Sequence, residues 1–167
     1  MKNFGLALIL LFSLGSFSQT TTFIVLRHAE KADNSKDPNL SVDGLKRAEE
    51  LQKTLSPISV EAIYATPFNR TKQTVTPLAT EKRISITEYP ANKPYAELVN
   101  ELIEAYRGKT VVIVGHSNTV PELLKVLSNN TFNISISENQ FDNLFVVTLT
   151  DGKQPEVVPM KYGKSTP

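Results

Sequence analysis

The chain contains only two histidines, His28 and His116, and each follows a short apolar run rich in β-branched residues. Arg27 directly precedes His28, and Arg70 comes soon after a third run of this kind, residues 60–64. Guanidinium groups bind phosphoryl oxygens through paired, charge-assisted hydrogen bonds, and an imidazole can attack phosphorus or carry a proton. These residue types therefore predict a cationic site for a phosphorylated ligand.

The composition narrows the class of protein further. The 167 residues include 18 Lys and Arg against 17 Asp and Glu, so the net charge is only +1 and a general nucleic-acid binder is disfavoured. The absence of cysteine excludes disulfide scaffolds, thiolate metal sites and cysteine nucleophiles. The length indicates a single domain with a sizeable core.

The first 18 residues have the pattern of a secretory signal peptide. A positive residue precedes an apolar stretch over residues 4–14, and small residues lead up to a predicted cleavage between Ser18 and Gln19. The stretch is shorter than the ~20 residues that span a bilayer, which disfavours a retained membrane anchor. We expect residues 19–167 to form one domain that is periplasmic or secreted and is free of the membrane after cleavage.

Two kinds of apolar pattern alternate along the rest of the chain. Short apolar runs predict strands at 22–26, 60–64 and 110–114, and alternation of Ile84 and Ile86 with polar neighbours predicts a short strand at 84–86. Helical spacing predicts helices at 41–55, 67–79, 95–106 and 120–127. Residues 144–149 and 156–160 flank Asp151-Gly152 as a predicted terminal hairpin. This alternation predicts an α/β fold, a three-layer α/β/α sandwich with a mainly parallel central sheet. Residues that follow the strands, including both histidines, should meet at one edge of that sheet.

Four blocks of the sequence carry recognisable motifs: RHAE at 27–30, LSVDGLKRA at 40–48, YATPFNRTKQT at 64–74 and VGHS at 114–117. In this order they resemble the histidine phosphatase superfamily, in its phosphoglycerate mutase-like branch, whose signature is a strand that runs into Arg-His-Gly. Two positions depart from the family pattern, because Ala29 replaces the glycine of the signature and Thr66 replaces a serine of the third block.

The resemblance implies a role for each matched residue. His28 would attack phosphorus and carry the phosphoryl group as phosphohistidine, while Arg27, Arg70 and His116 would bind the phosphoryl oxygens. Nearby positive charge would lower the pKa of His28 and keep its imidazole neutral. Asn34 follows His28 at the spacing of a phosphate-contacting asparagine in the mutase-like branch.

The family often takes the proton for the leaving group from a glutamate just after the third strand, and Glu88 stands at that place as the expected general acid. The plain alternative for Glu88 is a solvated loop carboxylate. Glu30 and Glu97 are the competing candidates, and Glu97 fits the polar face of a helix.

We therefore expect an exported, metal-independent phosphatase that acts on phosphate monoesters, with a small phosphorylated substrate, no cofactor and no nucleic-acid partner. Two other functions of the same fold stay open: a phosphomutase, and a module that binds phosphorylated ligands without catalysis. A metal-dependent hydrolase using His28, His116 and Asp33 is disfavoured, because arginines beside the histidines oppose a divalent cation.

Overall fold

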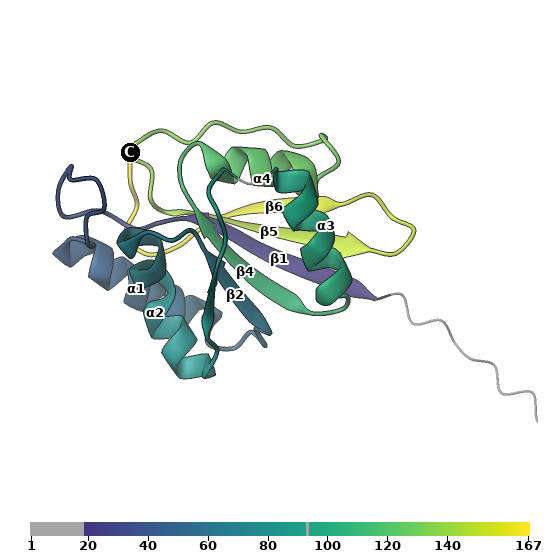
Figure 1. Ribbon diagram of the computed structural model, residues 1–167, viewed down its shortest axis with the longest axis horizontal. Helices are drawn as coiled ribbons and strands as arrows, with labels where there is room; N and C mark the ends of the chain where they lie inside the picture. Colours follow the sequence, from purple (N-terminus) through teal and green to yellow (C-terminus); the bar gives the residue numbers. More distant parts are fainter. Residues whose placement is uncertain (1–18, 93) are drawn as a thin grey trace, which may run out of the picture.

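The structure is a computed structural model that describes residues 19–92 and 94–167, so the predicted signal peptide lies outside the described residues. Strands and helices alternate along the chain (Figure 1). The elements are β1 (Thr20–Arg27), α1 (Val42–Leu55), β2 (Ala62–Ala65), α2 (Asn69–Lys82), β3 (Ile86–Glu88), α3 (Tyr95–Ala105), β4 (Thr110–Gly115), α4 (Thr119–Leu127), β5 (Asn143–Thr150) and β6 (Glu156–Lys161).

A six-stranded sheet forms the middle layer, in the order β3-β2-β4-β1-β5-β6. The strands β3, β2, β4 and β1 run parallel, and the hairpin of β5 and β6 extends the sheet antiparallel to β1. Helices α1 and α2 cover one face, and α3 and α4 cover the other (Figure 1). The predicted three-layer α/β/α sandwich with a mainly parallel sheet is confirmed.

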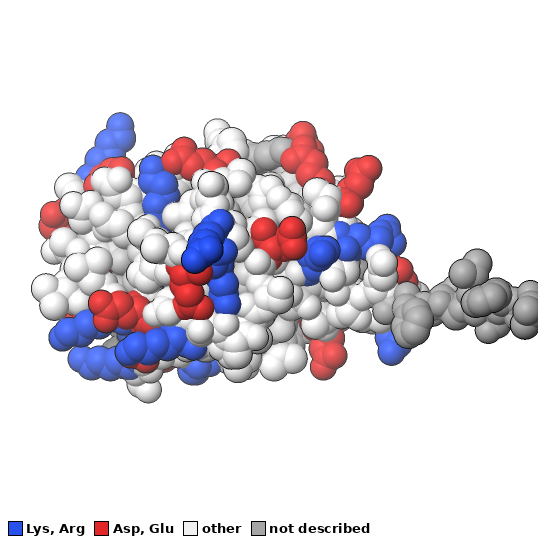
Figure 2. All heavy atoms as spheres, turned by 90° about the horizontal axis from the view of Figure 1, so that it is seen from below, with Lys and Arg blue, Asp and Glu red and all other residues white. Residues whose placement is uncertain are grey.

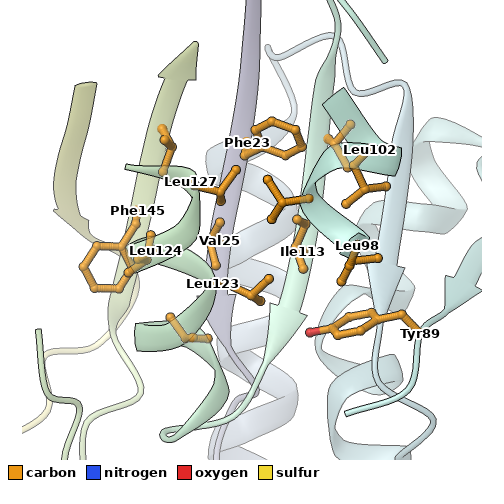
Figure 3. Close-up of a cluster of buried hydrophobic side chains, with 14 of the residues drawn as sticks. Phe23, Val25, Tyr89, Leu98, Leu102, Ile113, Leu123, Leu124, Leu127 and Phe145 are labelled. Carbon is orange, nitrogen blue, oxygen red and sulfur yellow. The ribbon is translucent and has the colours of Figure 1, made fainter. Parts of the chain in front are cut away.

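Strand β1 has a continuous apolar sequence because both of its faces are covered. Phe23 and Val25 pack against leucines of α3 and α4 (Figure 3). Ile24 and Leu26 point to the opposite layer, where they pack with residues of α1 and α2. Burial on both sides fixes the strand in place and with it the residues that follow its carboxyl end.

Helix α2 continues further than its sequence predicts. We expect an end near Ala79, because Pro77 has no N–H to donate and its ring crowds the preceding turn, yet the helix runs to Lys82. Val75 and Leu78, on either side of Pro77, are fully buried against the sheet. The packing of this face outweighs the hydrogen bond that the proline cannot make.

Gly44 lets helix α1 begin directly against the end of β1. A Cβ at this position would clash with the carbonyl oxygen of Glu30. The same carbonyl accepts the backbone N–H of Ser41 at 2.9 Å, and the Ser41 hydroxyl caps the helix by accepting from the Gly44 N–H at 3.1 Å. The second sequence block therefore docks α1 onto the strand that carries Arg27 and His28.

The surface carries mixed charge. Figure 2 shows basic side chains gathered at the left end of one face, with acidic side chains among them and across the rest of the view. Such mixing agrees with the small net charge of the chain and gives no broad field of one sign over this face. Among the described residues, no helix has the length and apolar character needed to cross a membrane.

Candidate active site

A cleft of about 380 Å³ lies at the carboxyl edge of the parallel strands. Its walls are Arg27, His28, Lys31, Ser35, Lys36, Pro38, Phe68, Arg70, Ala91, His116, Ser117, Asn118, Thr119 and Glu138. Four predicted site residues, Arg27, His28, Arg70 and His116, thus come together in one cleft. This is the edge at which parallel α/β sheets bind ligands.

The register between β1 and β4 brings the two histidines together. Arg27 pairs with Gly115 across the two strands, and the backbone N–H of His28 donates to the Gly115 carbonyl at 3.0 Å. The imidazoles of His28 and His116 consequently meet edge to face, with ring centroids 5.3 Å apart. A Cβ at Gly115 would clash with the Thr119 hydroxyl, which accepts the backbone N–H of His116.

The imidazole of His28 is held in one tautomer by its own backbone. Its Nδ1 lies 2.7 Å from the carbonyl oxygen of Ala29. A carbonyl only accepts hydrogen bonds, so Nδ1 carries the proton and Nε2 carries the lone pair. The arrangement leaves the lone pair of Nε2 outside this hydrogen bond.

Alanine fits the position where the family has glycine. Ala29 is not one of the described residues with positive φ, and its methyl group is buried in a small cluster with Leu40 and Ala48. Its backbone N–H donates to the Thr74 hydroxyl at 2.9 Å. The substitution therefore leaves the backbone conformation free of strain, and Thr74, from the third sequence block, anchors it.

His116 is oriented by groups on both sides of its ring. Its Nε2 lies 2.8 Å from the Thr66 hydroxyl, and its Nδ1 lies 3.5 Å from Arg70 Nη2. A guanidinium only donates, which makes Nδ1 the acceptor and Nε2 the donor to Thr66. The Thr66 hydroxyl donates in turn to Thr71 at 3.1 Å, so a chain of hydrogen bonds holds the ring.

Burial is the largest influence on both histidines. It lowers the pKa of His28 to about 3, although the hydrogen bond to the Ala29 carbonyl opposes the change, and the charges of Arg27 and Arg70 lower the pKa further. Burial, followed by the same two arginines, lowers the pKa of His116 to about 4. The expected neutral imidazole at His28 is therefore favoured, with burial rather than neighbouring charge as the main cause.

Arg27 is the most deeply placed cation of the cleft, with only 1% of its surface exposed. Its Nη1 donates to the carbonyls of Ser137 at 2.7 Å and Gln140 at 3.2 Å, and its guanidinium carbon lies 4.4 Å from the centre of the Phe141 ring. Its Nη2 pairs with the Glu138 carboxylate at 2.7 Å. The buried Nε has no hydrogen-bond partner among the described residues.

Arg70 supplies the second cation from the start of α2. Its Nη1 lies 3.8 Å from the Asp37 carboxylate, and its guanidinium carbon lies 4.5 Å from the centre of the Phe68 ring. The same third block also fixes the opposite wall, because Gln73 accepts the backbone N–H of Leu40 at 2.7 Å. The block therefore both delivers a cation and holds the loop after β1.

Glu88 and Asn34 do not line the cleft. Glu88 ends β3, which β2 and β4 separate from β1, and its half-exposed carboxylate pairs with Lys72 at 2.8 Å. Asn34 is exposed in the loop between β1 and α1, next to Ser35, which does line the cleft. The proposed roles of Glu88 and Asn34 stay predictions.

The competing carboxylates also lie away from the cleft walls. Glu30 forms a salt bridge with the buried Arg47 at 2.7 Å, and Glu97 lies in the first turn of α3. Asp33 accepts the backbone N–H of Ser35 at 2.7 Å. In the part of the chain that the structure describes, no three His, Asp or Glu side chains gather as a metal site.

Two residues near the cations carry no signal in the sequence. Glu138 and Phe141 come from the irregular stretch between α4 and β5, where no periodic pattern predicts which side chain points where. Thr66 stands in a motif block, but its link to His116 depends on a long-range contact between β2 and β4. These partners are identified only by the folded structure, because each contact joins segments far apart in the sequence.

Comparison with known proteins gives a family-model match over part of the chain and a fold for the whole domain. Residues 23–91 match the model of the histidine phosphatase superfamily (branch 1), a segment that includes Arg27, His28 and Arg70 but ends before His116. No curated protein sequence matches the chain.

Solved structures of the same fold include the protein histidine phosphatase SixA complexed with tungstate, with a TM-score of 0.68 and 17% identity over 84% of this chain and 96% of that one. YhfR of Bacillus stearothermophilus has a TM-score of 0.67 and 16% identity over 83% and 95% of the two chains. A phosphoserine phosphatase mutant from Entamoeba histolytica, in complex with phosphoserine, has a TM-score of 0.61 and 16% identity over 85% and 96%.

These identities are low, and the structural likeness alone establishes only the fold. The matched segment adds the sequence pattern of the first three blocks, and the paired strands β1 and β4 add the second histidine beside the first. Residues 23–91 therefore carry the sequence pattern of the histidine phosphatase superfamily (branch 1), and the chain has the phosphoglycerate mutase-like fold.

Proposed function

We propose that this protein is a phosphatase that hydrolyses phosphate monoesters through a phosphohistidine formed on His28. The observation that carries the proposal is the fixed tautomer of His28, whose Nδ1 binds the Ala29 carbonyl and leaves the Nε2 lone pair in a cleft shared with Arg27, Arg70 and His116. A neutral imidazole among cations is arranged for attack on an anionic phosphoryl group.

In the first step, Nε2 of His28 forms a bond to phosphorus as the ester P–O bond breaks in line with it. Arg27 and Arg70 bind the equatorial oxygens, on which charge is spread in the transition state. His116 adds a hydrogen bond from Nδ1 when it takes up a proton beside the anionic group. In the second step, water attacks phosphorus, the P–N bond breaks, and inorganic phosphate leaves.

The leaving oxygen takes up a proton as the ester bond breaks. Glu88 is the proton donor implied by the family resemblance, but its carboxylate pairs with Lys72 outside the cleft walls. Donation from Glu88 therefore requires this exposed pair to open. A leaving group that is stable without a proton, such as an aryl oxide, would not depend on it.

The comparisons support a phosphatase with a small substrate. The solved structures of this fold include a protein histidine phosphatase and a phosphoserine phosphatase bound to phosphoserine. The proposed phosphatase transfers the phosphoryl group to water. A phosphomutase would transfer it to a second hydroxyl group, and a binding module would turn over no substrate.

Replacement of His28 tests the proposal. We expect His28→Ala to lower the hydrolysis of para-nitrophenyl phosphate by roughly a thousandfold or more, as loss of a nucleophile does in other enzymes. When the wild-type protein is mixed with radiolabelled substrate and quenched rapidly without acid, the labelled phosphoryl group should be found on one histidine. The variant should carry no label.

Binding of inorganic phosphate to His28→Ala, measured by calorimetry, is the control for an intact cleft, because the variant keeps Arg27, Arg70 and His116. Hydrolysis by a folded His28→Ala protein at the wild-type rate would contradict the proposal. Label that passes to an added alcohol instead of water would favour the phosphomutase.

We also propose that the protein is exported, on the pattern of residues 1–18 alone. The expected product of cleavage begins at Gln19. Expression of the full chain in a bacterial host, followed by fractionation and mass determination of the N-terminal peptide, measures this directly. Recovery of the uncut chain from the cytoplasm would contradict the proposal.

A further inference from the structure

Glu138 joins two walls of the cleft. One carboxylate oxygen accepts from Arg27 Nη2 at 2.7 Å, and the other accepts from the Ser117 hydroxyl at 2.5 Å. Arg27 ends β1 and Ser117 directly follows His116 at the end of β4. The carboxylate therefore bridges the ends of the two strands that carry the histidines.

Arg27 does not need this carboxylate to keep its orientation. Its Nη1 is fixed by the carbonyls of Ser137 and Gln140, and its guanidinium lies over the Phe141 ring. These groups hold the guanidinium of Arg27 in place without Glu138. The contact with Glu138 therefore uses a donor, Nη2, without being required for the position of the cation.

The two partners differ sharply in exposure. The side chain of Arg27 is 2% exposed, whereas that of Glu138 is 79% exposed. An exposed carboxylate can turn into solvent at little cost, and an exposed partner contributes modestly to an ion pair. Glu138 is thus the displaceable member of the pair.

We propose that Glu138 is a specificity-determining residue that competes with the phosphoryl group for Arg27. The inference rests on the proposed function in one respect, because it takes the ligand of the cleft to be a phosphoryl group. A phosphoryl oxygen and the Glu138 carboxylate need the same Nη2 donor, and two anions at one guanidinium repel each other. Binding of phosphate therefore requires Glu138 to leave Arg27.

This competition makes binding depend on the charge of the ligand. A dianionic phosphoryl group, as in a phosphate monoester, offers more charge to Arg27 and Arg70 than a single carboxylate does and displaces Glu138. A monoanionic ligand, such as a phosphodiester, offers no such advantage. Glu138 thus selects for terminal phosphoryl groups.

Calorimetric titration with inorganic phosphate, at low salt and about pH 8 where phosphate is largely dianionic, tests the proposal without requiring turnover. Glu138→Gln keeps the shape of the side chain and removes its charge. We expect its dissociation constant for phosphate to fall by about three- to tenfold, the range for loss of one partly exposed charged competitor. Ser117→Ala, which frees one carboxylate oxygen, should shift it in the same direction by less.

Asp151→Asn is the matched control, because Asp151 is also an exposed carboxylate paired with an arginine, Arg107, at 3.2 Å and is absent from the cleft walls. This variant should leave the dissociation constant unchanged. An unchanged or weakened affinity in Glu138→Gln would overturn the proposal, since the carboxylate would then be a bystander or a support for Arg27. Absence of phosphate binding in both the wild type and Glu138→Gln would overturn it as well.

Hydrolysis measured on the same proteins separates the two proposals. Tighter phosphate binding by Glu138→Gln without turnover by any variant would uphold the role of Glu138 and overturn the phosphatase. Turnover that depends on His28 with unchanged phosphate affinity in Glu138→Gln would do the reverse.

Discussion

At the scale of single residues, the chemistry of the cleft depends on burial. His28 and His116 are 4% and 9% exposed, and removal from water disfavours the charged imidazolium more than either arginine does. The sequence shows the two arginines, but the burial of the two imidazoles is known only from the structure. A histidine with ordinary exposure beside the same arginines would be partly protonated below neutral pH and would attack phosphorus more slowly.

The burial of both imidazoles predicts how they titrate. Their lowered pKa values, about 3 and about 4, mean that each ring stays neutral as the pH falls through the reference value of about 6.5 and takes up its proton only in more acidic solution. Because the chain has two histidines, an NMR titration of untagged residues 19–167 should show two imidazole signals, both with midpoints below about pH 5.

Saturating phosphate should raise the midpoint of His116, since a bound anion stabilises the imidazolium. His116→Asn leaves a single signal and assigns it to His28. A midpoint of His28 at its ordinary value in the folded protein would contradict the prediction, because it would show that burial does not disfavour the imidazolium of His28.

At the scale of elements, the periodic segments could be predicted and the irregular ones could not. The strands that end in Arg27 and Gly115 are apolar on both faces, which marks them as central and parallel, and this alone placed both histidines at one edge. Residues 128–142 have no such repeat, so the position of Glu138 in the cleft could not be predicted from the sequence. Glu88 shows the limit of a motif, because the strand predicted at 84–86 lies at Ile86–Glu88 and the Glu88 carboxylate pairs with Lys72.

At the scale of the whole molecule, the C-terminal segment closes the end that carries the cleft. In Figure 1 the C-terminus lies at the same end as the loop between β1 and α1. Asp142, which follows the Phe141 that stacks on Arg27, accepts the Thr166 hydroxyl at 2.7 Å and Lys161 at 2.8 Å. Burial alone would raise the pKa of Asp142, but these hydrogen bonds outweigh it and lower the pKa to about 2.

Arg47 makes the second link between the C-terminal segment and the cleft. It binds both carboxylate oxygens of Glu30, and it donates to the carbonyls of Tyr162 at 2.9 Å and Lys164 at 2.7 Å. Glu30 continues the block that contains His28, so one buried guanidinium connects the loop after β1, helix α1 and the C-terminal segment. Removal of this cation would leave a largely buried carboxylate and two carbonyls without their donor.

We therefore expect Arg47→Met, which keeps much of the apolar stem, to lower the free energy of unfolding by about 3 kcal/mol, the cost of breaking a buried pair on one side. Urea unfolding followed by circular dichroism measures this change.

Lys53→Met is the matched control on the same helix, because Lys53 pairs with Glu50 at 2.8 Å in solvent. It should change the free energy of unfolding by less than about 0.5 kcal/mol. Adding Glu30→Gln to Arg47→Met should recover part of the loss by removing the stranded charge. Equal stability of the two single variants would mean that Arg47 does not hold this end of the molecule together.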